Sequence, residues 1–191
     1  MLIRNATAAD AGHLARFINM AADDLPLHFW QKSVGPDDDP WVYGQLRAAR
    51  ETGSFSYHNA WIAEVDGVIA ACLLGYPAAT EPQPADPDTS PILVPLLDLE
   101  SLAHGSWYRN VLATYDGFRG MGCGNALLAH ADGGARQLGH SSISLIAADT
   151  HHAALRLYGA NGYREVARRD VVKGHWQVDA QVWILFTKAV D

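Results

Sequence analysis

Six residues near the middle of the chain have the composition of an anion-binding loop. They read Arg119-Gly-Met-Gly-Cys-Gly124 and precede an Ala- and Leu-rich segment at residues 125–138, which predicts a helix. Glycines before a helix let the backbone approach a ligand closely, and the N–H groups of the first helical turn point towards that ligand. The chemistry that this pattern favours is the binding of phosphate groups.

The spacing of the loop separates it from two common nucleotide sites. No Gly-Lys-Ser/Thr follows, so the loop is not a Walker loop. Gly120, Gly122 and Gly124 are spaced two and two, which is not the Gly-x-Gly-x-x-Gly of dinucleotide-binding folds. A nucleotide-binding α/β domain is therefore disfavoured, while a flexible loop before an ordinary helix stays open as the plain alternative.

Strands and helices must position this loop. Residues 110–115 form an apolar run without a breaker and are bounded by the turn pair Asp116-Gly117, which predicts a strand. After the loop, one helix face should be apolar, and its members are Leu127, Leu128, Ala131, Ala135 and Leu138. Residues 149–163 predict a second, short helix ended by Asn161-Gly162 and followed by another strand.

Together these segments resemble the GNAT superfamily of acyl-CoA-dependent N-acyltransferases. The family's strand–(Gln/Arg)-x-x-Gly-x-(Gly/Ala)–helix segment is matched by Arg119, Gly122 and Gly124. Its Asn-x-x-Ala-x-x-x-Tyr-x-x-x-Gly-Phe segment is matched by His151-x-x-Ala154-x-x-x-Tyr158-x-x-x-Gly162-Tyr163. His151 departs from the family's usual Asn at one cofactor contact. The resemblance is most specific over residues 107–165.

The resemblance implies an α/β fold with a central mixed β-sheet flanked by helices. It also implies a single domain over residues 1–191, with an acetyl-CoA-binding core at 107–165 and the acceptor side at 1–95. The patterns along the chain agree with that order. Strands are predicted at 2–6, 60–65, 68–76, 142–147, 163–173 and 181–188, and helices from the Thr7–Asp10 capping box onward, around 27–32, at 41–51 and as a turn at 96–103.

One stretch carries no signal for a helix or a strand. Residues 77–95 contain six prolines, which favours an irregular insertion and equally allows a mobile lid.

The resemblance assigns roles to the matched residues. Tyr158 is the candidate catalytic acid, because the family's matching Tyr donates a proton to the leaving sulfur, and Thr114 is the candidate for a backbone oxyanion donor. The backbone of the central strand should pair with the pantetheine arm, and the loop amides should hold the pyrophosphate. The implied cofactor-binding residues are Leu112, Ala113, Thr114, Arg119, Gly120, Met121, Gly122, Cys123, Gly124, Asn125 and His151.

A general base is not assigned by the motifs. The family often places Glu or His on the central strand, and none lies between Trp107 and Tyr115. Glu100, His104 and His175 are the nearest candidates, and a water relay is the alternative. His151 and His152 are adjacent and have no further ligand at metal spacing, so no metal is expected.

The implied function is an acetyl-CoA-dependent N-acetyltransferase acting on a small primary amine or an amino terminus. The alternative is a non-catalytic acyl-CoA-binding sensor on the same fold. Trp30, Trp41 and Trp176 are candidates to line an acceptor pocket, although buried core positions are the commoner use of such aromatics. Members of the family are often dimers, so a homodimer is an open expectation.

Charge and composition limit the partners. The chain has a net charge of −7, with 12 acids and 5 bases in residues 1–95 and 9 of each in residues 96–191. A basic nucleic-acid footprint is absent, and no apolar run reaches membrane-spanning length. The acidic half either attracts a cationic amine or carries ordinary solvated charges. Two cysteines, Cys72 and Cys123, and no secretion signal favour a reducing cytoplasm.

Overall fold

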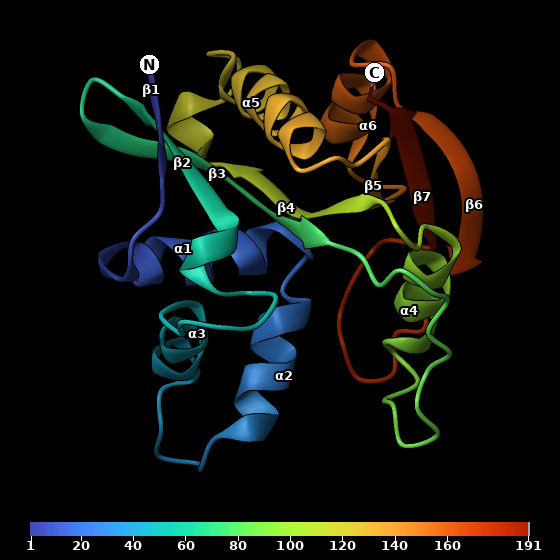
Figure 1. Ribbon diagram of the computed structural model, residues 1–191. Coiled ribbons are helices and arrows are strands. Elements are labelled where there is room, and N and C mark those ends of the chain that lie inside the picture. Colours follow the sequence, from blue (N-terminus) through green and yellow to red (C-terminus); the bar gives the residue numbers. More distant parts are fainter. Residues whose placement is uncertain (191) are drawn as a thin grey trace. The chain divides into compact units, whose positions relative to one another are not determined.

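A computed structural model describes residues 1–190 of the chain as a mixed β-sheet with accompanying helices (Figure 1). The strand order is β1-β2-β3-β4-β5-β7-β6. The strands are β1 (Leu2–Asn5), β2 (Ala60–Val65), β3 (Val68–Pro77), β4 (Trp107–Thr114), β5 (Ser142–Ala148), β6 (Arg164–Asp170) and β7 (Val182–Ala189). The α-helices are α1 (Ala11–Ala21), α2 (Leu25–Ser33), α3 (Pro40–Ala48), α4 (Val94–Leu102), α5 (Cys123–Gln137) and α6 (His152–Ala160). The predicted mixed α/β sheet is confirmed.

The chain forms two compact units. The first comprises residues 1–75 and 111–127, and the second comprises residues 76–110 and 128–191. Strands β3 and β4 and helix α5 each contribute residues to both units. The predicted division into an acceptor side and a cofactor core stays a prediction.

In the first unit, a hairpin and three helices follow the sequence patterns closely. Strands β2 and β3 pair antiparallel around Asp66 and Gly67, whose φ angles of 52° and 78° are those of a mirror-image hairpin turn. Helices α1, α2 and α3 pack together beside these strands (Figure 1). Gly44 on α3 lies under the Trp30 ring, where a Cβ atom would come within 2.5 Å of a ring carbon, so this contact requires glycine.

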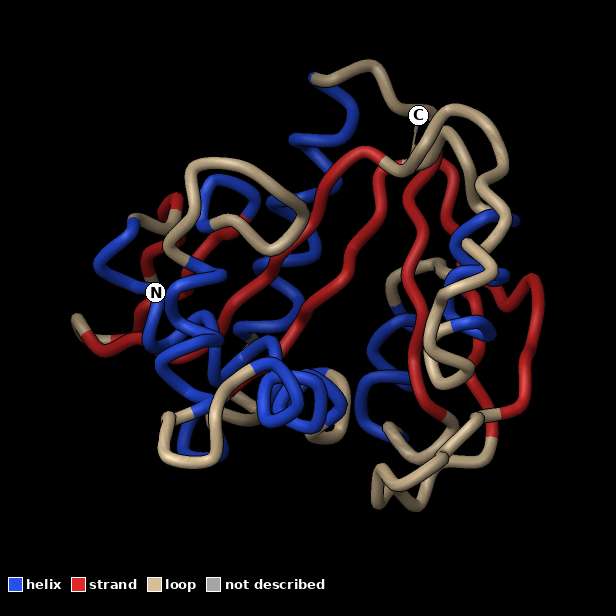
Figure 2. Tube along the Cα trace, turned by 90° about the horizontal axis from the view of Figure 1, so that it is seen from below, coloured by secondary structure: helices blue, strands red, loops and turns tan. Residues whose placement is uncertain are grey.

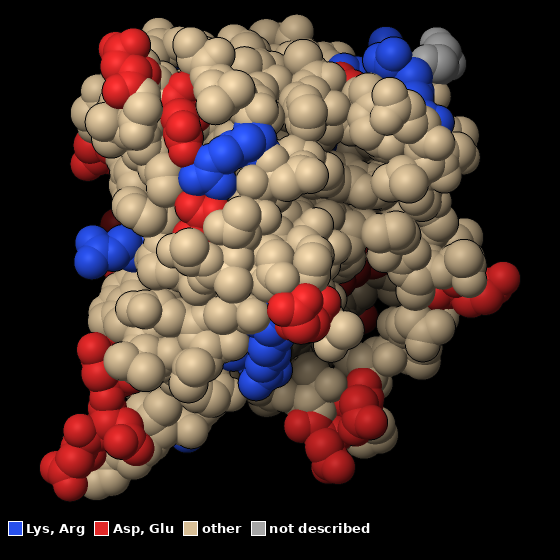
Figure 3. Space-filling model, turned by 60° about the vertical axis from the view of Figure 1, so that its left-hand side comes forward, with Lys and Arg blue, Asp and Glu red and all other residues tan. Residues whose placement is uncertain are grey.

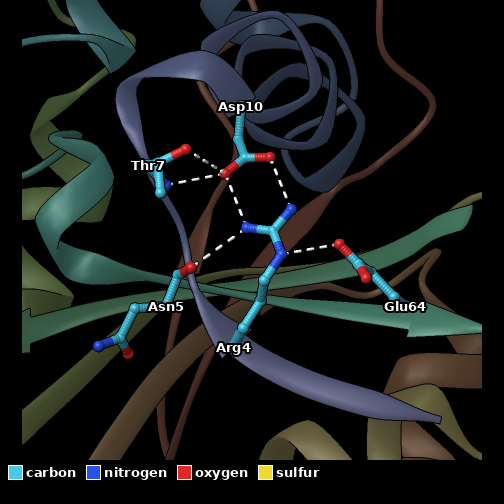
Figure 4. Close-up of polar contacts among 5 residues, drawn as sticks. All are labelled: Arg4, Asn5, Thr7, Asp10 and Glu64. Atoms are coloured by element: carbon cyan, nitrogen blue, oxygen red, sulfur yellow. Dashed lines mark hydrogen bonds and ion pairs between the residues drawn. The ribbon is translucent and has the colours of Figure 1, made fainter. Parts of the chain in front are cut away.

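The junction between β1 and α1 is held by a polar network around Arg4 (Figure 4). The Arg4 guanidinium donates two hydrogen bonds of 2.8 Å to the Asp10 carboxylate and one of 2.7 Å to Glu64. Asp10 also accepts hydrogen bonds from the Thr7 backbone and hydroxyl, which confirms the predicted capping box. Because Arg4 lies beside it, the pKa of Asp10 falls from 3.8 to about 2.

In the second unit, β5 lies between β4 and β7. Its residues 143–145 pair parallel with residues 107–109 of β4, and its other edge pairs antiparallel with β7. Strand β6 pairs antiparallel with β7 and completes the order, and α4 packs on both of these strands. Figure 2 shows the strands in red, the helices in blue and the loops and turns that join them in tan.

Several element bounds differ from the sequence expectation. Helix α4 begins at Val94 and is longer than the predicted turn, while residues 78–93 contain neither helix nor strand, as predicted. Leu138 was expected on the apolar face of α5, and this is wrong: the helix ends at Gln137 and Leu138 is 67% exposed. Gly133 and Gly134 do not pack closely against the sheet, since a Cβ atom at either would meet nothing within 4 Å.

Candidate active site

Two glycines of the loop have a backbone conformation that side chains other than glycine rarely adopt. Gly120 and Gly122 have φ angles of 79° and 84°, in the left-handed region that favours glycine. A Cβ atom at either position would meet nothing within 4 Å, so the space beside the loop backbone is open. Met121 between them is exposed. The loop therefore presents its main chain to an incoming group.

Helix α5 begins within the last residues of this loop, at Cys123. Its first backbone hydrogen bond runs from Ala126 N–H to the carbonyl of Gly122, at 3.0 Å. The amides of Cys123 and Gly124 precede that bond, and the dipole of a 15-residue helix stands behind them. An open glycine backbone followed by helix N-terminal amides is a donor set that fits a diphosphate, the group that acetyl-CoA would place there.

Side chains of the loop contribute less than its backbone. The exposed Arg119 forms a 3.0 Å ion pair with Asp116, so its charge is partly neutralised. Asn125 is exposed, and Cys123 is a buried free thiol. On β4, Ala113 is buried while Leu112 and Thr114 are half-buried. Their backbone roles towards a pantetheine arm stay predictions.

A pocket of about 480 Å³ lies beside the loop, within the first unit. Its lining residues are Met20, Asp23, Asp24, Tyr115, Asp116 and Arg119. Three carboxylates against one guanidinium make this an acidic pocket. Asn19 holds Asp24 in place at the edge of this pocket, because the Asn19 side chain accepts a hydrogen bond from the Leu27 amide and donates one to Asp24.

Tyr115 forms the aromatic wall of this pocket. Its hydroxyl hydrogen bonds to Nδ1 of His13 at 2.9 Å, and its ring packs on Phe17 with the centroids 4.3 Å apart. Burial raises the pKa of the Tyr115 phenol, which keeps it protonated at neutral pH.

In the second unit, Tyr158 lies on α6 and is 6% exposed. Its ring packs against Tyr163 and Phe186, with centroid distances of 5.7 and 6.2 Å. Burial raises the pKa of the phenol to about 12, and the positive charge of Arg109 acts against that rise. Tyr158 is therefore a neutral phenol at neutral pH, and burial makes it a weaker acid than an exposed tyrosine.

Glu100 differs from the other base candidates in its surroundings. Glu100 lies on α4, hydrogen bonds with the buried Tyr108 hydroxyl, and has its pKa raised by burial. His104 is exposed and contacts the Thr80 carbonyl at 3.2 Å, and His175 is exposed. Burial therefore distinguishes Glu100 from the two histidines as a candidate base.

The predicted acceptor aromatics are mostly core residues. Trp30 is 6% exposed and packs on Gly44 and, edge to face, on Trp41. Trp176 is 3% exposed and stacks on Trp183 at an angle of 8°. His151 is half-buried at the start of α6.

Sequence reasoning missed one buried charge close to Tyr158. Arg109 on β4 is 3% exposed and pairs with Asp132 of α5, which also binds Lys188 of β7 at 2.7 Å. The signal was present, because a lone arginine inside an otherwise apolar strand is rare unless it is paired. Its partner Asp132 is 23 residues away in the sequence, so the sequence alone did not predict the ion pair.

Charges elsewhere are mixed. On the face shown in Figure 3, acidic and basic side chains are interspersed. Within residues 1–190, no helix is long and apolar enough to cross a membrane, and no three His, Cys, Asp or Glu side chains gather as metal ligands would.

Comparison with known proteins agrees with these features. Residues 19–163 match the Acetyltransferase (GNAT) family, and no curated protein matches the sequence. An acetyltransferase crystal structure superposes with a TM-score of 0.69 at 21% identity, covering 100% of both chains. An N-acetyltransferase from Staphylococcus aureus Mu50 gives 0.68 at 17% identity, covering 98% of this chain and 100% of that one.

A third structure, the ribosomal-protein-S18-alanine N-acetyltransferase from Escherichia coli, gives a TM-score of 0.55 at 15% identity, covering 100% of this chain and 94% of that one. At these identities the likeness shows the fold, whereas the family match spans most of the chain and both motif segments. The chain belongs to the GNAT acetyltransferase family, whose acyl donor is acetyl-CoA.

Proposed function

We propose that the protein is an N-acetyltransferase that moves the acetyl group of acetyl-CoA directly to a primary amine. The observation that carries this proposal is Tyr158, which stands at the family's motif position and lies buried on α6. A binding module has no need of a proton donor there. The acceptor is a small amine or an amino terminus.

The chain's residues divide the work of transfer among them. The amides at the start of α5 hold the diphosphate, and the backbone of Leu112–Thr114 orients the pantetheine arm. Bound acetyl-CoA supplies a thioester, and the Thr114 N–H stabilises the negative charge that develops on its carbonyl oxygen. Tyr158 gives its proton to the departing thiolate.

The acceptor must lose a proton before it attacks. A lysine-like amine has a pKa of about 10.4, so its neutral form at pH 7 costs roughly 4–5 kcal/mol. Glu100, with its raised pKa, is the side chain best suited to take that proton, and a water relay is the alternative.

The acidic pocket of the first unit supports a cationic small molecule as acceptor. Its carboxylates, Asp23, Asp24 and Asp116, would attract an ammonium group, and Arg119 offsets only one of them. The E. coli fold neighbour acts on a ribosomal-protein alanine, and this keeps the amino-terminus alternative in view.

A sensor that binds acyl-CoA without turnover is the second candidate. The absence of a carboxylate from residues 107–114 favours it. We also infer a cytoplasmic location, supported by the buried free thiols of Cys72 and Cys123, and we keep a homodimer as an expectation.

Cofactor binding is tested first by calorimetric titration of acetyl-CoA and free CoA. The wild type should bind in the micromolar range, and Gly122→Glu should abolish binding, because it strains a φ of 84° and adds a negative charge at the diphosphate site. Gly133→Glu is the matched control, since its side chain would enter open space on α5. Absence of wild-type binding would overturn both the enzyme and the sensor.

Turnover separates the two candidates. With an amine panel and detection of released thiol, Tyr158→Phe should lower kcat about 100-fold or more and leave the Kd for acetyl-CoA unchanged. A wild type that binds acetyl-CoA but releases no thiol with any amine would favour the sensor.

A further inference from the structure

Arg109 is a charged residue buried in the second unit, with 3% of its surface exposed. Its guanidinium donates hydrogen bonds to the Asp132 carboxylate and, at 3.1 Å, to the Leu128 carbonyl. The Nε and Nη1 donors make no hydrogen bond. Instead, the guanidinium lies over the rings of Tyr163 and Trp107, 5.2 and 5.9 Å from their centroids.

The charges of this cluster do not cancel. Lys188 binds the second oxygen of Asp132 at 2.7 Å, so one carboxylate serves two cations. The Lys188 ammonium also lies 5.7 Å from the Tyr163 ring centroid. Arg109, Lys188 and Asp132 together carry one uncompensated positive charge, in surroundings where screening by water is weak.

Tyr163 links this charge to Tyr158. The Tyr163 ring has the Arg109 guanidinium against it and the Tyr158 ring 5.7 Å from it. We infer that Arg109 is a positioning residue for the transfer reaction, whose surplus positive charge favours the phenolate that Tyr158 becomes when it donates its proton. This inference rests on the proposed function, in which Tyr158 is the general acid.

The proton balance of the step is simple. The amine nitrogen forms a bond to the thioester carbon, and the carbon–sulfur bond breaks with its electron pair on sulfur. Tyr158 gives its proton to that sulfur and recovers one from solvent. The acceptor nitrogen, which gave up one proton to Glu100 or a water relay before it attacked, loses a second proton to solvent as the amide forms. The phenolate exists between the loss and the recovery of the Tyr158 proton, and Arg109 lowers its free energy, just as its positive charge opposes the rise in the pKa of Tyr158 that burial causes.

Other titratable groups besides Arg109 also interact with Tyr158. Tyr108 on β4 interacts electrostatically with Tyr158 and hydrogen bonds to Glu100 of α4. Tyr163 contacts the Tyr158 ring, and Phe186 of β7 is apolar. Glu100 is the acid among these groups and hydrogen bonds to Tyr108, while Arg109 is the cation whose charge acts on Tyr158.

The test replaces Tyr158 with 3,5-difluorotyrosine, whose more acidic phenol titrates in an accessible pH range and reports through its ¹⁹F signal. Arg109→Met should raise the pKa of that phenol by about one unit or more. Asp132→Asn should lower it, because two cations then remain without a carboxylate. The control is Arg156→Met, at an exposed position on α6, the helix that carries Tyr158, and it should leave the pKa of the phenol unchanged.

Kinetics supply the second measurement, with tyrosine at position 158. The single-turnover rate should fall about tenfold in Arg109→Met and recover in part in Arg109→Lys, while KM for both substrates stays the same. If Arg109 has only a structural role, Arg109→Met and Asp132→Asn should shift the pKa of the fluorinated phenol in the same direction, or should leave it at the value of the Arg156→Met control. Either result overturns the inference.

The inference and the proposed function fail in different ways. If Tyr158→Phe keeps full turnover, the proposed acid is wrong, whatever the ¹⁹F titration shows. If Tyr158→Phe is slow but Arg109→Met does not change the pKa of the fluorinated phenol, only the inference is wrong. Should Arg109→Met not fold, Asp132→Asn carries the test, because it should still lower the pKa of the fluorinated phenol, whereas Arg109→Lys keeps the positive charge and should leave that pKa near the wild-type value.

Discussion

Each unit contains a cluster of charged side chains around one arginine, and the two clusters have opposite net charges. Around Arg4, one guanidinium meets two carboxylates, and its Nε and both Nη atoms donate hydrogen bonds. Around Arg109, one carboxylate meets two cations, and two guanidinium donors have aromatic rings in place of oxygen acceptors. The first cluster carries a surplus negative charge and the second a surplus positive charge.

The difference suggests what each cluster is for. Arg4 lies at a strand–helix junction, is partly exposed, and closes a capping box, so its network fixes the path of the chain. Arg109 is buried, where an unbalanced charge costs folding free energy, so a role in the reaction would explain why the charge is kept. A guanidinium whose nitrogens all donate hydrogen bonds to oxygen atoms indicates a structural role. A surplus buried charge beside a candidate acid instead indicates a role in function.

The largest expected effect is in the Arg109 cluster. Asp132→Ala removes the carboxylate that both Arg109 and Lys188 share, and we expect the free energy of unfolding to fall by about 3–5 kcal/mol in urea denaturation. The exposed Asp98→Ala, which removes a 3.6 Å contact with Arg169, should cost less than about 0.5 kcal/mol. A loss below about 1 kcal/mol for Asp132→Ala would mean that water already solvates the two cations.

The Arg4 cluster should respond to acid. The pKa of Asp10 is lowered in the folded state, from 3.8 to about 2, so its stabilisation is complete above pH 4 and is lost as the pH falls from 4 to 2. Asp10→Asn should lower the free energy of unfolding by roughly 2 kcal/mol at pH 7 and flatten its pH dependence in that window.

Asp37→Asn, in the exposed loop between α2 and α3, is the control for this titration and should reproduce the wild-type curve. If Asp10→Asn keeps the wild-type slope between pH 4 and 2, the acid sensitivity arises from other carboxylates.

Local sequence signals predicted most of the first unit. The Thr7–Asp10 capping box and the Asp66-Gly67 hairpin each depend on residues within four positions, and the structure has both. Ends of elements were harder, because they depend on packing: Leu138 continues an apolar period but lies beyond the end of α5.

The candidate site divides in the same way. Gly122 and Tyr158 were found because each stands in a short motif with fixed spacing. Arg109 was not, since its partner Asp132 is 23 residues away and nothing local marks the pair. Sequence also does not separate core aromatics from ligand-binding ones, as Trp30 beneath Gly44 illustrates.

The smallest expected effects come from the secondary partner in each cluster. Glu64→Gln leaves the Arg4–Asp10 pair intact, and Lys188→Met leaves the Arg109–Asp132 pair intact. Each substitution should change the free energy of unfolding by less than about 1 kcal/mol, because each removes a partly exposed ion pair.

Catalysis should nevertheless tell these two variants apart. Glu64→Gln should leave the single-turnover rate unchanged. Lys188→Met neutralises the surplus charge of the Arg109 cluster, so it should raise the free energy of the Tyr158 phenolate and slow the single turnover about twofold to threefold, without a change in Kd for acetyl-CoA. Equal rates in both variants would show that Arg109 alone sets the potential at Tyr158 and that Lys188 serves only to hold Asp132. A slower rate in Lys188→Met alone, at matched stability, would show that the net charge of the buried cluster, and not its rigidity, reaches the phenol.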